Sequence, residues 1–331
     1  MGNIDLGPFI SGIVIIVALY AINALATNLK FGTAGLVDFG TVAYFAVGAY
    51  AFVLVTAPHP TELSAYKVGL DLPLWVGFLA APIAAGLFSL IIGPPALRLS
   101  GDYLAIATYA AAEVLRAVLS NEAWLANGVV GFVNLRQPFR SLFDSSTAYQ
   151  YFYMVVVLVV LFVTYIVLNR MNWGPFGRSL RSIRENPDVA LSVGKNVPRY
   201  RLKAFVVGGL IGGFTGALYV TFARIILPNM FVAEVTFVMW IGLIIGGLGN
   251  YRGAILGTAI LVTAQELTRF VPIPPQYAPV MAGVRWMIMG ILLMVILRYW
   301  PKGMLPERHP VDPPPRQQPL ARARIDEPMP E

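Results

Sequence analysis

The stretch RMNWGPFGRSLRSIRENPDVALSVGKNVPRYRLK, residues 170–203, is strongly basic and lies between two long apolar runs. Eight of its side chains are Arg or Lys, and only Glu185 and Asp188 carry the opposite charge. Loops of this kind between apolar segments stay on the cytoplasmic side of a membrane, where Lys and Arg are retained. The stretch therefore predicts a polytopic membrane protein whose central loop is cytoplasmic.

This loop contains the signals of a short helix. Asn186 can cap a helix, Pro187 suits its first turn, and Asp188 complements the positive end of the helix dipole. Gly194 tolerates the left-handed conformation in which many helices end. We therefore expect a helix over residues 187–193.

The expected helix presents Val189, Ala190 and Val193 on one side, as an apolar ridge with no obvious core of its own. A second short basic helix is expected before it, over residues 178–185. A helix with such a ridge can dock into a groove on a partner protein. Alternatively, it lies in the lipid headgroups, where its basic neighbours hold it.

The composition of the whole chain points the same way. Of 331 residues, 57% are hydrophobic and only 12% are charged, whereas soluble domains carry roughly 25% charged residues. The absence of Cys excludes disulfides, thiolate metal sites and Cys nucleophiles, and two His leave little for metal or acid–base chemistry. The net charge of +7 resides in loops between spans, so membrane topology explains it better than nucleic-acid binding. We expect an integral membrane protein that is not an enzyme and needs no cofactor.

Nine segments approach the roughly 20 apolar residues that a helical span needs. They are residues 8–28, 33–56, 73–97, 103–119, 151–168, 204–222, 231–248, 254–267 and 280–297. The predicted fold is an all-α polytopic bundle of about nine spans, with a membrane domain over residues 1–300. The Pro-rich tail, residues 301–331, is expected to be disordered.

Charge sets the predicted orientation of these spans. Placing Lys30, Arg98, the basic loop, Arg252 and the tail inside puts the N-terminus outside and the C-terminus in the cytoplasm. The polar loops 57–72 and 120–148 then fall outside. The first apolar run follows a segment without a basic n-region, so it is interpreted as a true span rather than a cleaved signal.

Small residues indicate which helices pack closely. The sixth predicted span carries Gly208, Gly212 and Gly216 at four-residue spacing, with Gly209 and Gly213 beside them. Such spacing lets helix backbones approach each other. The second predicted span is also rich in Gly and Ala and is expected to be central. The fifth is almost entirely β-branched or aromatic and is expected at the lipid-facing edge.

Three of the ionisable side chains within predicted spans are candidates for a polar path or an ion pair. Asp38 either faces a polar path or partner, or lies near the interface beside Lys30 and ends its span. Glu113 and Arg116 are three residues apart, so they can pair on one helical face. That pair is either structural or part of a polar passage. We also expect small and weakly polar residues of the second, fourth and sixth spans to line a pathway.

The run GRSLRSIRENPDVALSVGKNVPRYRLKAFVVGGLIGGFTGALYV, residues 177–220, resembles the coupling-loop region of ABC-importer permeases, specifically the LivM-type permeases of branched-chain amino-acid importers. In that family an acidic–Ala–Ala pattern followed by Gly docks onto the ATPase subunit. Asp188, Ala190 and Gly194 match this pattern. Val189 stands where Ala or Ile is usual.

Three further stretches carry the same resemblance. They are GTAGLVDFGTVAYFAVGAY at 32–50, RLSGDYLA at 98–105 and GGLGNYRGAILGTAI at 246–260. At the position of Asp38 the family often has a small polar residue. The glycine-rich run at 246–260 is not followed by Lys-Ser/Thr, so a phosphate-binding loop is a poor interpretation.

The resemblance implies a permease subunit that forms half of a transmembrane pathway. It also implies two ABC ATPase subunits, a second related permease, a periplasmic or lipid-anchored binding protein, and a bacterial inner-membrane location. Relatives serve branched-chain amino acids, other amino acids, urea or short amides. The residues it implies in coupling are Arg184, Glu185, Pro187, Asp188, Ala190 and Gly194.

A self-sufficient secondary transporter or channel is the alternative. Such proteins often show an internal repeat with broken helices. The two halves of this sequence show no convincing repeat. The absence of a Walker motif means that a permease of this kind would depend on separate ATPases.

Overall fold

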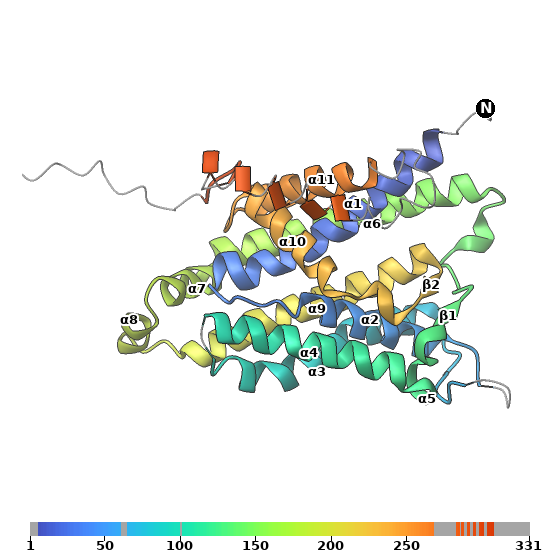
Figure 1. Cartoon of the computed structure of the whole chain (residues 1–331), viewed down its shortest axis with the longest axis horizontal. Coiled ribbons are helices and arrows are strands. Elements are labelled where there is room, and N and C mark those ends of the chain that lie inside the picture. The colour runs from blue at the N-terminus through green and yellow to red at the C-terminus, as the bar shows by residue number, and fades with distance from the viewer. Residues whose placement is uncertain are drawn as a thin grey trace, which may run out of the picture.

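The structure is a computed structural model, and it describes residues 6–60, 65–99, 101–267, 283–284, 286–287, 290–291, 294–295, 298–300 and 303–307. Long helices run side by side along the longest axis of the molecule (Figure 1). Helices α7 (Pro175–Glu185) and α8 (Pro187–Ser192) project at one end. A two-stranded ladder of β1 (Phe132–Val133) and β2 (Ile225–Ile226) lies toward the other end.

Eight of the nine predicted spans correspond to helices. They are α1 (Leu6–Asn28), α2 (Thr41–Thr56), α3 (Leu74–Ala96), α4 (Asp102–Asn121), α6 (Ser146–Trp173), α9 (Val197–Ala223), α10 (Ala233–Gly246) and α11 (Tyr251–Leu267). Among the described residues, six helices are long and apolar enough to cross a membrane, and α2 and α11 are shorter. The ninth predicted span lies mostly outside the described residues, as does the tail beyond residue 307.

Helix α9 occupies the centre of the bundle, between α2 and α3. A side chain at Gly216 would strike the backbone of Phe45 in α2. On its other side, a side chain at Gly213 would strike Ala81 and Ala85 of α3. The doubled glycine face therefore brings α9 into backbone contact with two neighbours, as its spacing predicts.

The second predicted span, residues 33–56, is not a continuous helix. Helix α1 ends in a π-helical turn, Leu29–Thr33, and residues 34–40 are not helical before α2 begins at Thr41. Gly35 has φ +70°, and the Asp38 side chain accepts a hydrogen bond from the Gly40 N–H at 2.8 Å. Glycines and a local Asp turn favour such irregular backbone over helix, although the segment is apolar enough to span.

Helix α6 lies where it was predicted, whereas the loop 120–148 differs from its prediction. Helix α6 presents an apolar outer face that includes Val155, Val159 and Phe162, which confirms its place at the edge. The predicted loop 120–148 is more ordered than expected. It contains α5 (Ala123–Ala126), 3-10 turns at Gly128–Val130 and Arg140–Leu142, and strand β1.

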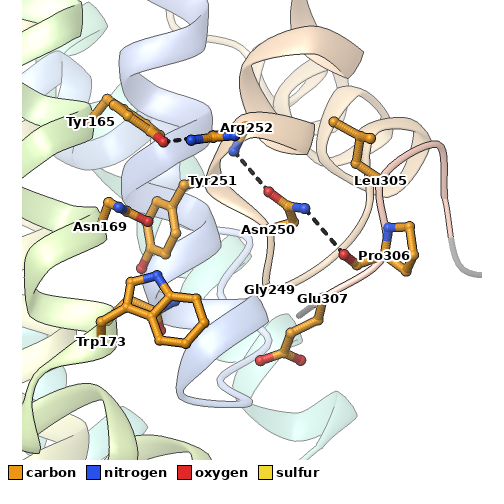
Figure 2. Close-up of a pocket in the computed structure, with 11 residues that line it drawn as sticks. Tyr165, Asn169, Trp173, Gly249, Asn250, Tyr251, Arg252, Leu305, Pro306 and Glu307 are labelled. Atoms are coloured by element: carbon orange, nitrogen blue, oxygen red, sulfur yellow. Dashed lines mark hydrogen bonds between the residues drawn. The ribbon is translucent and has the colours of Figure 1, made fainter. Parts of the chain in front are cut away.

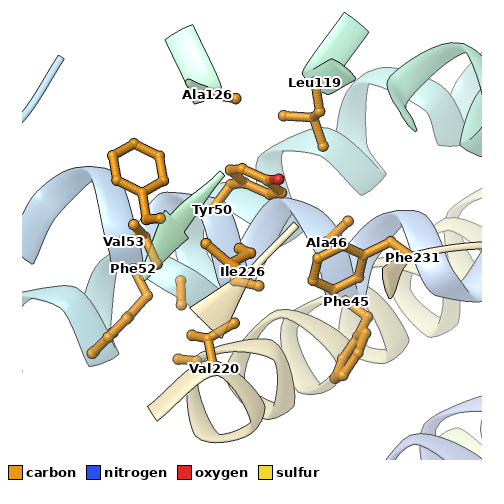
Figure 3. Close-up of a cluster of buried hydrophobic side chains, with 14 of the residues drawn as sticks. Phe45, Ala46, Tyr50, Phe52, Val53, Leu119, Ala126, Val220, Ile226 and Phe231 are labelled. Carbon is orange, nitrogen blue, oxygen red and sulfur yellow. The ribbon is translucent and has the colours of Figure 1, made fainter. Parts of the chain in front are cut away.

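A hydrophobic core closes the end of the bundle near β1 and β2 (Figure 3). Ile226 of β2 is fully buried there against α2, α4 and α9, and Phe231 follows the 3-10 turn Pro228–Met230. Phe132 pairs with Ile226 across the antiparallel ladder. This core extends along α2, which carries Phe45, Tyr50 and Phe52 on its buried faces (Figure 3).

We predict that Gly216→Leu prevents normal assembly of the bundle, because its side chain meets backbone atoms of α2 that cannot rotate away. Overpacking of a core costs about 1–3 kcal/mol or more. Position 216 tolerates a side chain less well than position 212, because a Cβ atom at Gly212 would meet nothing closer than the Tyr44 side chain, at 3.2 Å. Yield and thermal unfolding temperature of the purified protein measure the effect.

The matched control is Gly283→Leu, since a side chain at Gly283 meets none of the described residues within 4 Å. Wild-type yield and unfolding temperature in Gly216→Leu would contradict the close contact of α9 with α2.

Candidate functional site

The loop that the sequence singled out folds as two short helices at the end of the bundle. Helix α8 begins as predicted, because the Asn186 Oδ1 atom accepts hydrogen bonds from the N–H groups of Asp188 at 3.0 Å and Val189 at 3.1 Å. Gly194 has φ +81° just beyond the last turn, and its N–H donates to the Leu191 carbonyl. Local capping chemistry thus defines both ends of this helix.

The two faces of α8 differ from the prediction at one residue. Ala190 does not belong to the exposed ridge; it is 2% exposed and packs against Ile183 of α7 and Val197 of α9. Leu191 is exposed as well, two residues from Val189 and from Val193 and therefore on another side of the helix, so the exposed apolar side chains are Val189, Leu191 and Val193. The helix is seated through Ala190 and offers three apolar side chains to the surroundings, which we call the α8 ridge.

The other predicted coupling residues separate into two groups. Glu185, Pro187 and Asp188 are exposed beside the ridge. Arg184 points the other way: its Nη1 atom donates to the Gly32 carbonyl, and its Nη2 atom pairs with Glu307 at 2.8 Å. Arg184 therefore ties α7 to the turn where α1 ends.

A second set of hydrogen bonds connects α7 to the same turn, through Asn172 of α6. The Arg181 Nη1 atom donates to Asn172 Oδ1 at 2.7 Å, and the Thr33 hydroxyl donates to the same oxygen at 3.4 Å. Thr33 also hydrogen-bonds the hydroxyl of Tyr251 at 3.2 Å. Sequence reasoning missed Arg181, although its spacing of three residues from Arg184 places both on one helical face.

A pocket of about 400 Å³ opens at this end of the bundle (Figure 2). Its wall combines the end of α6 with the turn that precedes α11 and with residues 305–307. Arg252 donates to the Tyr165 hydroxyl at 3.0 Å, and Asn250 donates to the Pro306 carbonyl at 3.1 Å. The segment after the last predicted span is thereby held against the same end of the bundle as α7 and α8 (Figure 1).

An ion pair lies buried in the interior, beyond that end. The ammonium of Lys30, a fully buried residue, contacts the Asp38 carboxylate, which is 1% exposed. The Lys30 Nζ atom also lies 4.5 Å from the centre of the Tyr44 ring and 5.7 Å from that of Phe205. Asp38 therefore lies beside Lys30, as one of its two interpretations has it, and both side chains are enclosed by protein.

Further polar groups surround the ion pair. Lys30 Nζ lies 3.5 Å from the Thr41 hydroxyl, and the indole N–H of Trp240 donates to the Asp38 carbonyl at 3.2 Å. Asn28 Oδ1 accepts from the Gly249 N–H at 2.9 Å, while its amide nitrogen and the Asn23 amide oxygen find no partner among the residues that the structure describes. Lone buried polar groups are costly, and in membrane proteins they mark polar paths or sites of movement.

The predicted pair of Glu113 and Arg116 forms on α4. Two nitrogens of the guanidinium contact Glu113 Oε2, at 2.7 and 2.9 Å. The side chains are 30% and 36% exposed, and no hydrogen bond or ion pair among the described residues joins them to Lys30 or Asp38. The three ionisable residues named from the sequence therefore belong to two separate places.

We predict that Asp38→Asn destabilises the chain by about 3–5 kcal/mol, the usual effect of leaving one charge of a buried pair without its partner. The double variant Lys30→Met/Asp38→Leu should recover most of this loss, because it buries neither charge. Thermal unfolding in detergent compares the variants.

Glu113→Gln is the matched control, since it breaks a half-exposed pair and should change stability by less than about 1 kcal/mol. Equal unfolding temperatures for Asp38→Asn and Glu113→Gln would refute the special status of the buried pair.

Comparisons with known proteins agree with this architecture. The chain is 29% identical to the probable branched-chain amino acid transport permease protein LivM of Methanocaldococcus jannaschii, over 94% of this chain and 96% of that protein. It is 29% identical to the high-affinity branched-chain amino acid transport system permease protein LivM of Escherichia coli, over 88% of this chain and 69% of that protein. A guanosine ABC transporter permease protein, NupQ of Bacillus subtilis, is 23% identical over 64% of this chain and 67% of its own length.

No solved structure matches the chain. The profile of the family described as "Branched-chain amino acid transport system / permease component" matches residues 9–297. The chain therefore belongs to the family of permease components of branched-chain amino-acid transport systems.

Proposed function

We propose that this permease component carries branched-chain amino acids and is driven through α8 by separate ATPase subunits. The observation that supports the coupling role is the α8 ridge, three exposed apolar side chains on a firmly capped helix at one end of the bundle. Helices of this kind bind in grooves of partner proteins. The family supports the class of transporter and the kind of substrate.

The proposed assembly contains two ATPase subunits, this chain, a second related permease and a periplasmic or lipid-anchored binding protein. The relatives support a pair of permeases, because the chain is also 25% identical to a probable permease protein LivH of Methanocaldococcus jannaschii, an organism that has a LivM protein as well. We propose the bacterial inner membrane as its location.

We propose nine spans, with the N-terminus outside and the C-terminus in the cytoplasm. Helix α1 begins at the end of the bundle that lies away from α7 and α8 (Figure 1), which supports this orientation. Because α8 would face the ATPases, that end is the cytoplasmic one. The basic side chains of the loop suit the same side.

Substrate identity requires its own test, because one relative is a guanosine permease. Liposomes containing the purified complex would be supplied with ATP and the binding protein, and uptake of labelled leucine, valine and guanosine compared. Leucine and valine uptake that depends on ATP is the expected result. Uptake by this chain alone would instead support a self-sufficient carrier.

Coupling is proposed to pass from α8 through α7 to the end of α1. Movement of α8 would shift α7, since Ala190 packs on Ile183. Arg184 then connects α7 directly to Gly32, and Arg181 connects it to Thr33 through the side chain of Asn172. Gly32 and Thr33 are only two and three positions from Lys30. The buried ion pair would respond to ATPase closure through this chain of direct contacts.

We predict that Val189→Ser/Leu191→Ser abolishes recovery of the ATPase while the protein still inserts, because the α8 ridge loses its apolar contact surface. Co-purification from membranes in mild detergent measures the effect. Val129→Ser/Val130→Ser is the control, since both valines are equally exposed but lie outside the coupling loop. Undiminished ATPase recovery in the ridge variant would exclude α8 as the docking element.

Ala190 and Gly194, which the sequence resemblance also implies in coupling, can be tested in the same way. A bulky residue at Ala190 should act indirectly, by lifting α8 from α7 and α9, and Gly194→Asp should strain the helix end at φ +81°. Both should abolish transport in a protein that still inserts.

We predict that Arg184→Ala uncouples the two activities: the ATPase still binds and hydrolyses ATP, but uptake falls at least tenfold. The reason is the loss of the contact with the Gly32 carbonyl and with Glu307. Arg178→Ala on the same helix is the control, because Arg178 is exposed and contacts only the nearby Trp173 carbonyl in the described structure. Normal uptake per ATP in Arg184→Ala would remove this contact from the coupling route.

A further inference from the structure

We propose that the outer face of α4 packs against a second permease chain and lines the pathway between the two chains. We call this surface the α4 face; it consists of Tyr103, Ile106, Ala110, Glu113 and Ala117. The inference rests on the proposed function and adds to it the helix through which the partner is met.

The exposed faces of the long helices are of two chemical kinds. Helix α6 exposes Val155, Val159, Phe162, Val163 and Ile166, all apolar. Helix α3 exposes Trp75, Leu79, Ile83, Leu87, Leu90 and Ile91, again all apolar. Faces of this composition suit the hydrocarbon of a bilayer.

Helix α4 does not suit that environment. Its mid-section carries the pair of Glu113 and Arg116, with side chains 30% and 36% exposed. Glu113 is the twelfth of 20 residues in the helix, about 16 Å from its start at 1.5 Å per residue. In a hydrocarbon core about 30 Å thick, which a helix of this length would just cross, Glu113 would lie near the middle.

A charged pair exposed at that depth requires protein or water beside it. Ionisable side chains in spans face the interior of a bundle or an aqueous cavity, because lipid gives them no hydrogen bonds. Within the described residues of this chain, Glu113 and Arg116 pair only with each other. The described residues therefore leave one side of the pair uncovered, and we assign that side to a partner chain.

The shape of the α4 face identifies a membrane-spanning partner. The face extends from Tyr103 near one end of the helix to Ala117 near the other, so its occupant must also cross the membrane. Ala110 and Ala117 permit close approach of another helix on either side of Glu113. The alanines allow a helix to come close, and the charged pair needs hydrogen-bonding groups that lipid tails lack. Together they favour protein over lipid beside this face.

A second chain of the same family is the occupant that fits. The chain is similar to permease proteins of two names, LivM and LivH, that occur in one organism. Related chains associate about an approximate twofold axis, which places equivalent surfaces opposite each other. Two α4 faces would then enclose a strip of polar groups between otherwise apolar walls.

The natural absence of Cys allows a direct test. Ala110→Cys and Ala117→Cys place one thiol on the α4 face, and Val159→Cys and Val163→Cys place one on the outer face of α6. Each variant, in membranes that contain the complete transporter, is labelled with benzophenone maleimide and irradiated. Cross-linked products are identified by mass spectrometry, and ATPase recovery is measured in parallel.

Cross-linking of the two α4 positions to a permease of this family, at least fivefold above the α6 positions, is the expected result. Cross-linking of the α4 positions to lipid alone, or a yield equal to that of α6, would overturn the inference. If the ATPase is still recovered in that case, only the α4 interface fails. Loss of the ATPase from all four variants and from the parent chain would instead refute the proposed function.

A charge-exchange variant tests the pair itself. Glu113→Arg/Arg116→Glu keeps both charges three residues apart, whereas Glu113→Ala leaves Arg116 alone. Recovery of the second permease should fall at least tenfold in Glu113→Ala and return at least in part in the exchanged variant. Full recovery in Glu113→Ala would show that the pair does not face the partner.

Discussion

The buried contact between Lys30 and Asp38 constrains the architecture around it. Neither charge reaches solvent, so each depends on the other and on nearby polar groups to offset lost hydration. Eight residues separate them in sequence, so the chain must turn back between them instead of continuing as one helix. The π-helical turn Leu29–Thr33 and the irregular residues 34–40 provide that return. A straight span over this region would place the two charges on different turns and leave the carboxylate without its partner.

The central position of α9 follows from the same contact. The stem of Lys30 lies where a side chain at Gly208 would stand, and Tyr44 and Phe205 place their rings beside the ammonium. The four-residue glycine repeat of α9 thus has two roles: Gly216 admits the backbone of α2, and Gly208 admits a charged side chain. The repeat alone predicts close packing, but its spacing says nothing about the lysine. For this reason the stability of α9 and of the ion pair should be coupled.

Some features of this fold could be predicted from the sequence, and others required the structure. The limits of α8 were predictable because Asn186 and Gly194 act on backbone atoms within a few residues of themselves. The direction of Ala190 was not, because it depends on α7 and α9 packing beneath it. Hydropathy treated residues 33–56 as one span and Lys30 as a loop charge, since an average over a window does not detect a pair that closes across a turn. The Glu113–Arg116 pair was predictable from helical spacing, whereas its exposure required the structure.

The break at the end of α1 also explains how a loop outside the bundle can act on its interior. Because the turn ends at Thr33, the carbonyl of Gly32 has no helical N–H ahead of it and is free to accept from Arg184. The same irregularity exposes the Thr33 hydroxyl to Asn172 and Tyr251. An uninterrupted helix would satisfy its own carbonyls and offer the coupling loop no backbone atom to hold. The feature that brings Lys30 to Asp38 is thus also the one that attaches α7, so under the proposed coupling a displacement of α8 would reach the buried charges through α7 and the turn Leu29–Thr33.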